Sequence, residues 1–178
     1  TSYRPGARFG PESIRKNSRL LRAYNREQGI YPFKNRIVVD GGDIVCSPFN
    51  NEKAIEQIYK SIKDNFNNFN NLVFLGGDHT ISYPILHSLY DKYGKVALIH
   101  LDSHLDTWDS YFDEKITHGT PFKRAVDEGY INTAKSLHIG VHGSTNSEED
   151  FIKDKNMGFT VISGKEIYKN GMDSCIDK

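Results

Sequence analysis

Cysteine is scarce in this chain, which has two thiols among 178 residues. Cys46 and Cys175 are far apart and fit no metal-ligand spacing. This excludes a disulfide-rich scaffold and a thiolate metal cluster, and it favours idle thiols in a reducing compartment. The sequence therefore predicts a cytoplasmic location.

An excess of charge of one sign is also absent, because Lys plus Arg and Asp plus Glu both number 23. No basic stripe or charge block indicates nucleic acid or an anionic membrane as a partner. The apolar runs are far too short to span a bilayer, and the first residues lack the layout of a signal peptide. We expect residues 1–178 to form a single domain with a sizeable core.

Helical and strand-like patterns alternate along the chain. Apolar residues at helical spacing and strand-like apolar runs are bounded by Gly, Pro and Asn. The expected helices are 11–24, 52–66, 81–93, 121–128 and 147–155, and the expected strands are 36–40, 72–75, 96–101, 137–141 and 159–162. Strands that alternate with helices predict an α/β fold, with a parallel sheet covered on both faces.

The two most informative motifs each follow an apolar run. Gly76-Gly77-Asp78-His79 comes after the expected strand 72–75, and Asp102-Ser103-His104-Leu105-Asp106 comes after 96–101. A helix between two such strands makes them parallel, so their carboxyl ends open at the same edge of the sheet. Ligands bind at that edge in open α/β sheets, and the His and Asp side chains therefore predict a metal site.

The spacing of the second motif carries a geometric prediction. Asp102, His104 and Asp106 would share a face of an extended strand. Full extension would place the outer two about 13 Å apart, so the chain must curl to bring them to one site. Carboxylates with imidazoles suit Mn²⁺, and two ions would need a bridging carboxylate, for which we choose Asp102. Polar caps on two strand–helix turns are the alternative interpretation.

The motifs in their order resemble those of a known family. They occupy residues 1–11, 40–43, 76–79, 102–107, 118–122 and 139–143. Together they resemble the ureohydrolases, the arginase and agmatinase superfamily, and most of all its agmatinase branch. The resemblance implies a three-layer α/β/α sandwich with a mainly parallel sheet, and a homo-oligomer.

The resemblance also implies a reaction. Ureohydrolases use two Mn²⁺ ions to activate a bridging water, which attacks the guanidinium carbon of a small substrate and releases urea and an amine. For an agmatinase-like enzyme, agmatine would give putrescine and urea. Carried over by motif, His79, Asp102 and Asp106 would ligate one ion, and His104 would ligate the other with Asp102 bridging. His118 would be the catalytic residue that positions the guanidino group and passes a proton to the departing amine.

The sequence departs from the family pattern in four places. Ser103 stands where Ala is usual, and His142 stands where the agmatinase-type motif has Arg. The family's first strand and its later Asp-x-Asp metal motif have no counterpart in the chain. We therefore expect a fragment or truncated product in which the dinuclear site is half built and activity is in doubt.

Other polar residues carry weaker predictions. We expect Asp78 to cap the following helix, and Asp40 and Asp43 to form a turn. His100 lies inside an apolar strand and is interpreted as a satisfied core histidine, while His138 carries no spacing signal.

Three alternatives remain open from the sequence. The chain is a degenerate homologue without activity, a related hydrolase of guanidino acids such as guanidinobutyrate, or a different dinuclear hydrolase such as a metallophosphoesterase. The last ranks low, because Gly-Asp-His precedes Asp-x-His-x-Asp here and no Asn-His-Asp follows.

Overall fold

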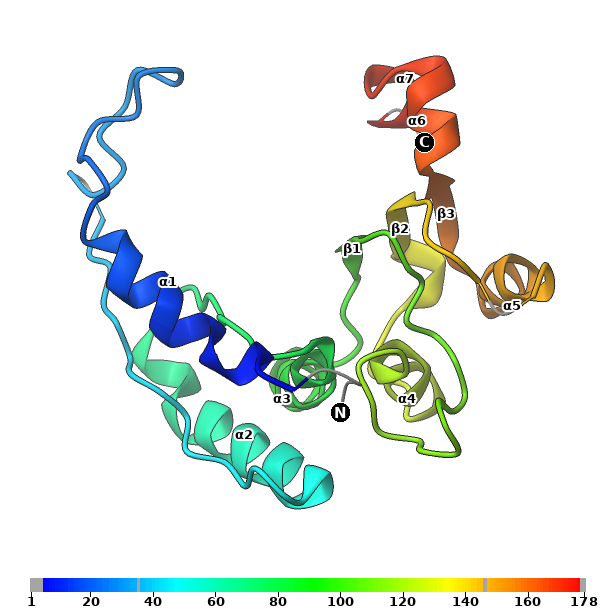
Figure 1. Ribbon diagram of the computed structural model, residues 1–178, viewed down its shortest axis with the longest axis horizontal. Helices are drawn as coiled ribbons and strands as arrows, with labels where there is room; N and C mark the ends of the chain where they lie inside the picture. Colours follow the sequence, from blue (N-terminus) through cyan, green and yellow to red (C-terminus); the bar gives the residue numbers. More distant parts are fainter. Residues whose placement is uncertain (1–4, 35, 146, 177–178) are drawn as a thin grey trace.

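The computed structural model describes residues 5–34, 36–145 and 147–176. Its ribbon forms an open crescent (Figure 1). One arm contains α1 (Gly10–Ser18), α2 (Asn51–Asn65) and long extended segments. The other arm contains the sheet and the later helices, and α3 (Ser82–Tyr93) lies between the two arms.

The sheet has three parallel strands among the described residues, in the order β1-β2-β3. These are β1 (Ile99–Leu101), β2 (Leu137–Val141) and β3 (Thr160–Ser163). The register pairs His100 of β1 with His138 of β2. Two imidazoles therefore start from neighbouring positions in the interior, which becomes important at the candidate site.

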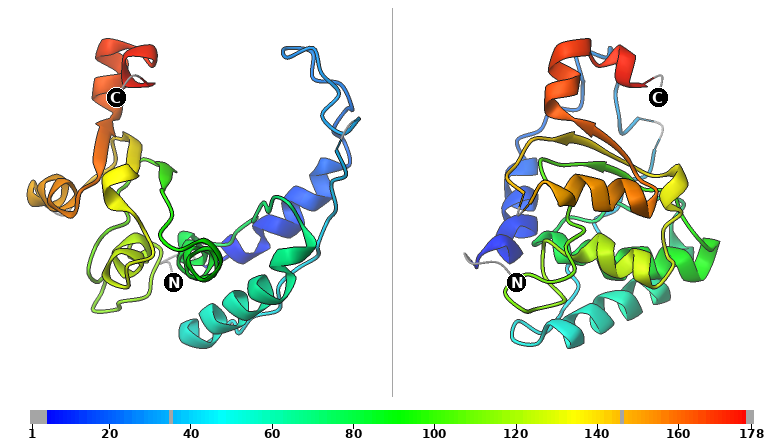
Figure 2. Two further views of the ribbon diagram at one scale, coloured as in Figure 1. Left: turned by 180° about the vertical axis from the view of Figure 1, so that it is seen from behind. Right: turned by 90° about the vertical axis from the view of Figure 1, so that its right-hand side faces the viewer.

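One face of this sheet is bare at β1, where Ile99 and Leu101 are 67% and 74% exposed, so the expected cover on both faces is incomplete among the described residues. Helices lie beside and beyond the strands (Figure 2). They are α4 (Pro121–Asp127), α5 (Glu149–Met157), α6 (Gly164–Asn170) and α7 (Asp173–Ile176), with short 3-10 turns at Ala7–Phe9, Phe66–Asn68, His79–Ile81 and Thr133–Lys135. Pro121 opens α4, where the missing N–H of proline costs no helical hydrogen bond. Gly158 ends α5 with φ 104°, a left-handed cap that strains any residue with a Cβ. The predicted α/β class is confirmed.

The core lies where α3 and α4 meet the sheet. Its buried members are Leu86, Phe122, Ala125, Tyr130, Ile131 and Phe159. Burying an apolar side chain as large as Phe122 contributes about 1.5–3 kcal/mol. This core fixes the helix N-termini and strand ends that carry the polar motifs.

Two expected strands are wrong among the described residues, because 36–40 and 72–75 are extended without strand pairing. Burial alternates along 72–75, as in a strand, and Val73 is 85% exposed. A strand needs a neighbour to take its backbone hydrogen bonds, and neither segment has one here. Only the last part of 96–101 joins the sheet, with Val96 in an isolated parallel bridge to Ile131.

The first expected helix is shorter than predicted, and the last two helices were not predicted. α1 ends at Ser18, and Leu20 and Leu21 beyond it are 78% and 72% exposed. Leu20 and Leu21 fit the helical spacing, but both side chains are exposed, so no packing stabilises a helix that continues past Ser18.

Within the described residues, no helix is both long and apolar enough to cross a membrane.

Candidate metal centre

His79 reaches the site from the turn that precedes α3. The Asp78 carboxylate caps this turn by accepting the backbone N–H of Thr80 at 2.9 Å, which confirms the predicted cap. A Cβ on Gly76 would come within 2.5 Å of the Ile81 side chain, so glycine allows the close turn. The cap and the glycine together fix the backbone position from which the His79 side chain extends.

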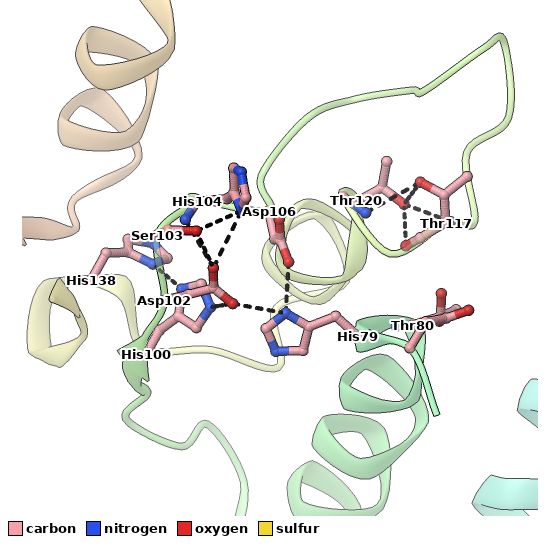
Figure 3. Close-up of polar contacts among 12 residues, drawn as sticks. His79, Thr80, His100, Asp102, Ser103, His104, Asp106, Thr117, Thr120 and His138 are labelled. Atoms are coloured by element: carbon pink, nitrogen blue, oxygen red, sulfur yellow. Dashed lines mark hydrogen bonds and ion pairs between the residues drawn. The ribbon is translucent and has the colours of Figure 1, made fainter. Parts of the chain in front are cut away.

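The second motif curls as it leaves β1, as its spacing predicts. Asp102 Oδ1 accepts the backbone N–H of His104 at 2.9 Å and starts the turn. Asp106 then adopts φ 54°, in the left-handed region, and its carbonyl accepts the N–H of Phe122 at 3.2 Å. The curl turns the carboxylates of Asp102 and Asp106 toward His79 (Figure 3).

Four side chains offer donor atoms that all lie within 4.8 Å of one another. They are His79, His100, Asp102 and Asp106. His79 Nδ1 lies 2.6 Å from Asp106 Oδ2 and 3.6 Å from Asp102 Oδ2. This set of two imidazoles and two carboxylates, partly or fully withdrawn from solvent, fits a borderline divalent ion such as Mn²⁺. Three of the four predicted ligands thus converge.

His104, the fourth predicted ligand, lies beside this group and not within it. Its imidazole is exposed, with Nδ1 at 3.4 Å from Asp102 Oδ1 and 3.0 Å from Ser103 Oγ. A Cβ on Gly143 would come within 2.6 Å of the ring, so this glycine leaves room for it. The role of His104 at a second ion stays a prediction.

His118, the predicted catalytic residue, lies in the loop between Asp106 and α4. It is half-buried, and its ring meets Tyr111 edge-on at 5.3 Å between centroids. The next residue, Gly119, lies against Trp108, whose backbone N–H donates to the Gly119 carbonyl at 3.2 Å. These contacts hold the loop around His118 in place. The catalytic role of His118 stays a prediction.

The carboxylates of the cluster favour positive charge beside them, whether a proton on His79 or a bound cation. The hydrogen bond to Asp106 raises the pKa of His79, although burial opposes it. Burial would raise the pKa of Asp102, but the backbone N–H of His104 and the nearby histidines outweigh it and lower this pKa. Asp102 is therefore an ionised carboxylate at neutral pH, as a metal ligand must be.

A row of buried polar side chains leads away from the cluster. His100 Nδ1 lies 2.7 Å from His138 Nδ1, and His138 Nε2 lies 3.2 Å from Asp154 Oδ2. The Thr107 hydroxyl donates to Asp154 Oδ1 at 2.5 Å. Burial lowers the pKa of His100 to about 4 and that of His138 to about 3, and it raises the pKa of Asp154 to about 6.

Sequence reasoning missed this row. His100 is buried as expected, but its Nε2 has no hydrogen-bond partner, so the interpretation as a satisfied core histidine is wrong. One signal was available, because His100 lies two residues before Asp102 and so shares its face of the strand. The pairing with His138 depends on strand register, which one sequence does not reveal.

This group of His and Asp donors, placed after β1 and in the turn before α3, could hold a metal ion, and the chain that carries it has an α/β fold. The chain belongs to the arginase family, whose family model matches residues 1–178. This confirms the ureohydrolase resemblance.

Relatives and a solved structure agree with the family assignment. The chain is 39% identical over 172 residues to mitochondrial agmatinase of Gallus gallus, covering 97% of this chain and 51% of the relative. It is 38% identical over 173 residues to guanidinobutyrase of Pseudomonas aeruginosa, covering 97% and 54%. The solved structure of proclavaminate amidino hydrolase from Streptomyces clavuligerus matches with TM-score 0.85 and 30% identity, covering 99% of this chain and 60% of that one. The chain therefore has the arginase fold and spans about half the length of these curated relatives.

Proposed function

We propose that the protein carrying this chain hydrolyses a guanidino compound with the help of Mn²⁺, and that agmatine, giving putrescine and urea, is the first candidate substrate. The observation that carries the proposal is the donor group of His79, Asp102 and Asp106, which lies after β1 and in the turn before α3. The names of the relatives, an agmatinase and a guanidinobutyrase, support the substrate class.

The residues divide the work by their positions. His79, Asp102 and Asp106 would hold one ion, and His104 would serve a second ion that shares Asp102. When bound, Mn²⁺ would lower the pKa of a water molecule and supply a nucleophile at neutral pH. Asp102, held by the N–H of His104, keeps its charge for the cation.

His118 would act on the substrate and not on the metal. An imidazole has a pKa near working pH, so it can orient the guanidino group and then pass a proton to the departing amine nitrogen. The packing of its loop against Trp108 and Tyr111 would hold the ring in place. This role supports the second half of the reaction, in which the carbon–nitrogen bond breaks.

A guanidino acid is the second candidate substrate. The identities to the agmatinase and to the guanidinobutyrase differ by a single percentage point, so they do not separate the two. The substrates differ at the far end, where agmatine carries an ammonium group and guanidinobutyrate a carboxylate. Discrimination therefore requires tail-recognising groups of opposite charge. A homo-oligomer in the cytoplasm, without nucleic-acid or membrane partners, remains part of the proposal.

Urea release tests this proposal. The product of the complete reading frame, loaded with Mn²⁺, is incubated with agmatine, arginine or 4-guanidinobutyrate. Urea from one of them supports the chemistry and names the substrate, and a chelator-treated sample should lose the activity. No urea from any of the three, with metal bound, would contradict the proposal and favour a degenerate homologue.

A further inference from the structure

Helix α5 presents two buried carboxylates to the loop that follows the second motif. Asp150 and Asp154 are four residues apart, so they lie on the same face of the helix, and they are 8% and 0% exposed. Asp154 Oδ1 accepts the hydroxyl of Thr107 at 2.5 Å, and Asp150 Oδ2 accepts the indole N–H of Trp108 at 3.3 Å. Carboxylates are seldom buried without partners, and these two bind consecutive residues of the loop. Helix α5 therefore holds the start of this loop.

Asp150 is held in place by its own helix. The backbone N–H of Ser147 donates to Asp150 Oδ2 at 3.3 Å, and the Ser147 hydroxyl donates to Oδ1 at 3.4 Å. Asp150 lies in the first turn of α5, where the helix dipole favours a negative charge. The acceptor for the Trp108 indole is thus a fixed point on a packed helix.

Trp108 joins the two halves of the loop that carries His118. Its backbone N–H donates to the carbonyl of Gly119 at 3.2 Å. A Cβ on Gly119 would come within 2.8 Å of the indole, so the ring lies directly against the residue after His118. The indole also stacks on Tyr111, with centroids 5.4 Å apart and planes at 15°. One side chain therefore contacts both the outgoing and the returning half of the loop.

Tyr111 carries the contact from the indole to His118. The two rings meet edge-on, with centroids 5.3 Å apart and planes at 80°. Tyr111 also closes a tight turn with Glu114 through two backbone hydrogen bonds of 2.9 and 3.1 Å. Between them, Phe112 and Asp113 have φ of 50° and 62°, a region that is costly for residues with a Cβ. Such strain persists only where the surroundings hold it, and the stacked indole contributes to that hold.

The returning half of the loop is held by two buried threonines on either side of His118. The backbone N–H of Thr117 donates to Thr120 Oγ1 at 2.9 Å (Figure 3). The hydroxyl of Thr120 in turn donates to the carbonyl of Lys115 at 2.8 Å. These bonds fix the backbone from which the His118 side chain extends, while the aromatic contact acts on its ring.

We propose that Asp150 is a positioning residue for His118: it holds the indole of Trp108, and through Tyr111 the indole sets the position of the imidazole. The inference rests on the proposed function, in which His118 passes a proton to the departing amine. Proton transfer needs hydrogen-bond reach, and a displacement of about 1 Å can lower a rate by roughly a hundredfold. Asp150 would therefore affect the chemical step without contacting the substrate or the metal.

Steady-state urea release by the Mn²⁺-loaded full-length protein provides the first test. Asp150→Ala removes the acceptor and should lower kcat about tenfold, with KM and Mn²⁺ content within about twofold of the parent. Asp150→Asn keeps an oxygen toward the indole and should restore kcat to within about twofold. An unchanged kcat in Asp150→Ala would overturn the proposal.

The matched control is Glu149→Ala, which removes the neighbouring carboxylate of the same helical turn. The Glu149 side chain is 73% exposed and pairs with Lys153, so it does not reach the loop. Its kcat should equal that of the parent. An equal loss of kcat in Glu149→Ala and Asp150→Ala would mean general damage to α5 and would overturn the proposal.

A double-mutant cycle separates positioning from a merely structural role. If Asp150 acts through His118, then Asp150→Ala should cause little further loss of kcat in a His118→Ala protein, because the positioned imidazole is already missing. Loss of packing alone would lower kcat by the same factor with and without His118. Equal factors in the two backgrounds would therefore overturn the proposal.

Crystal structures of the variants provide a readout that does not depend on activity. In Asp150→Ala the His118 ring should leave the position that it has beside Tyr111 in the parent. If Asp150→Ala does not fold, Trp108→Phe breaks the same hydrogen bond from the other side and should give the same displacement. An unmoved His118 ring would contradict only the role of Asp150, whereas a displaced ring in a protein that releases no urea would contradict only the proposed function.

Discussion

The two arms of the crescent differ sharply in packing. Residues 79–163 contain the parallel sheet and the buried core around Phe122, which is 1% exposed. The described residues of 5–50 include none that is buried, and Ile37 is 96% exposed. Residues 5–50 and 79–163 both have apolar segments, yet of the two only 79–163 arranges them around a common interior. We call 79–163 the packed arm and 5–50 the open arm.

The difference teaches what an apolar run needs in order to become a strand. The segment 36–40 and strand β1 look alike in the sequence, because each is a short apolar run that leads to Asp. β1 pairs with β2 in the sheet, whereas 36–40 finds no strand partner among the described residues. The candidate site lies in the packed arm, where the turn after β1 fixes the positions of Asp102 and Asp106.

The largest expected effect is on the metal ligands of the packed arm. Asp102→Ala removes the carboxylate nearest the rigid strand end and should lower urea release by roughly a thousandfold or more, since several kcal/mol of transition-state stabilisation depend on the metal. Steady-state urea assays and circular dichroism should show lost activity with a retained fold. Asp64→Ala, an exposed carboxylate on α2, is the control. Near-normal rates in Asp102→Ala would refute the metal assignment.

His118→Ala should affect turnover without removing the metal. Loss of a general acid lowers rates by about 10²–10⁴-fold. The measurement is kcat together with Mn²⁺ content by elemental analysis. A parallel loss of metal and activity would make His118 structural.

Core packing should respond very differently in the two arms. Phe122→Ala empties a buried site between α4 and the histidines, and it should lower the free energy of unfolding by about 3–5 kcal/mol. Phe49→Ala is the matched change in the open arm, where the ring is 97% exposed, and it should alter stability by less than about 0.5 kcal/mol. Urea denaturation measures both. Similar losses would show that the open arm is packed after all.

The buried acid Asp154 should give the packed arm a distinctive pH dependence. Its pKa is raised to about 6, so the folded chain binds more protons than the unfolded chain between about pH 4 and 6. The stability that Asp154 contributes is thus present in acid and is lost as the pH rises through 6. The difference in unfolding free energy between the parent and Asp154→Asn should decline by about 3 kcal/mol from pH 4 to above 6. A flat difference would contradict the raised pKa.

The smallest effect is expected in the open arm, where Arg15 binds Asp40 at 2.7 Å and Asp43 at 2.9 Å. These groups are solvent-exposed, so water and salt screen the pairs. Arg15→Ala should therefore lower the free energy of unfolding far less than Phe122→Ala does. In 1 M salt, the parent and Arg15→Ala should be equally stable. Thermal unfolding at two salt concentrations measures the effect of Arg15→Ala, and a large effect that is insensitive to salt would contradict the exposed geometry.

Local patterns predict the elements whose partners are close in sequence. The helices near 52–66, 81–93 and 121–128 appear close to the expected ends, because apolar spacing and the Pro and Asn caps act locally. The strand 137–141 also appears as predicted. By contrast, 36–40 and 72–75 carry strand-like patterns, but sheet pairing depends on distant segments that a local pattern does not contain.

The candidate site divides in the same way. The approach of His79 to Asp102 and Asp106 was predictable, because their two motifs follow apolar runs on either side of one helix, although 72–75 does not pair as a strand among the described residues. The row through His138 and Asp154 was not, because it depends on the register of β1 with β2 and on how α5 packs. Neither His138 nor Asp154 belongs to a motif, so only the structure brings them together.

The measurement that tests the central claim most directly is an anomalous-difference map at the manganese edge, from crystals of the full-length protein grown with Mn²⁺. The account predicts a strong peak coordinated by His79, Asp102 and Asp106, and a second peak beside Asp102 that His104 reaches. A map without a peak at these three side chains, or with manganese only elsewhere, would contradict the account.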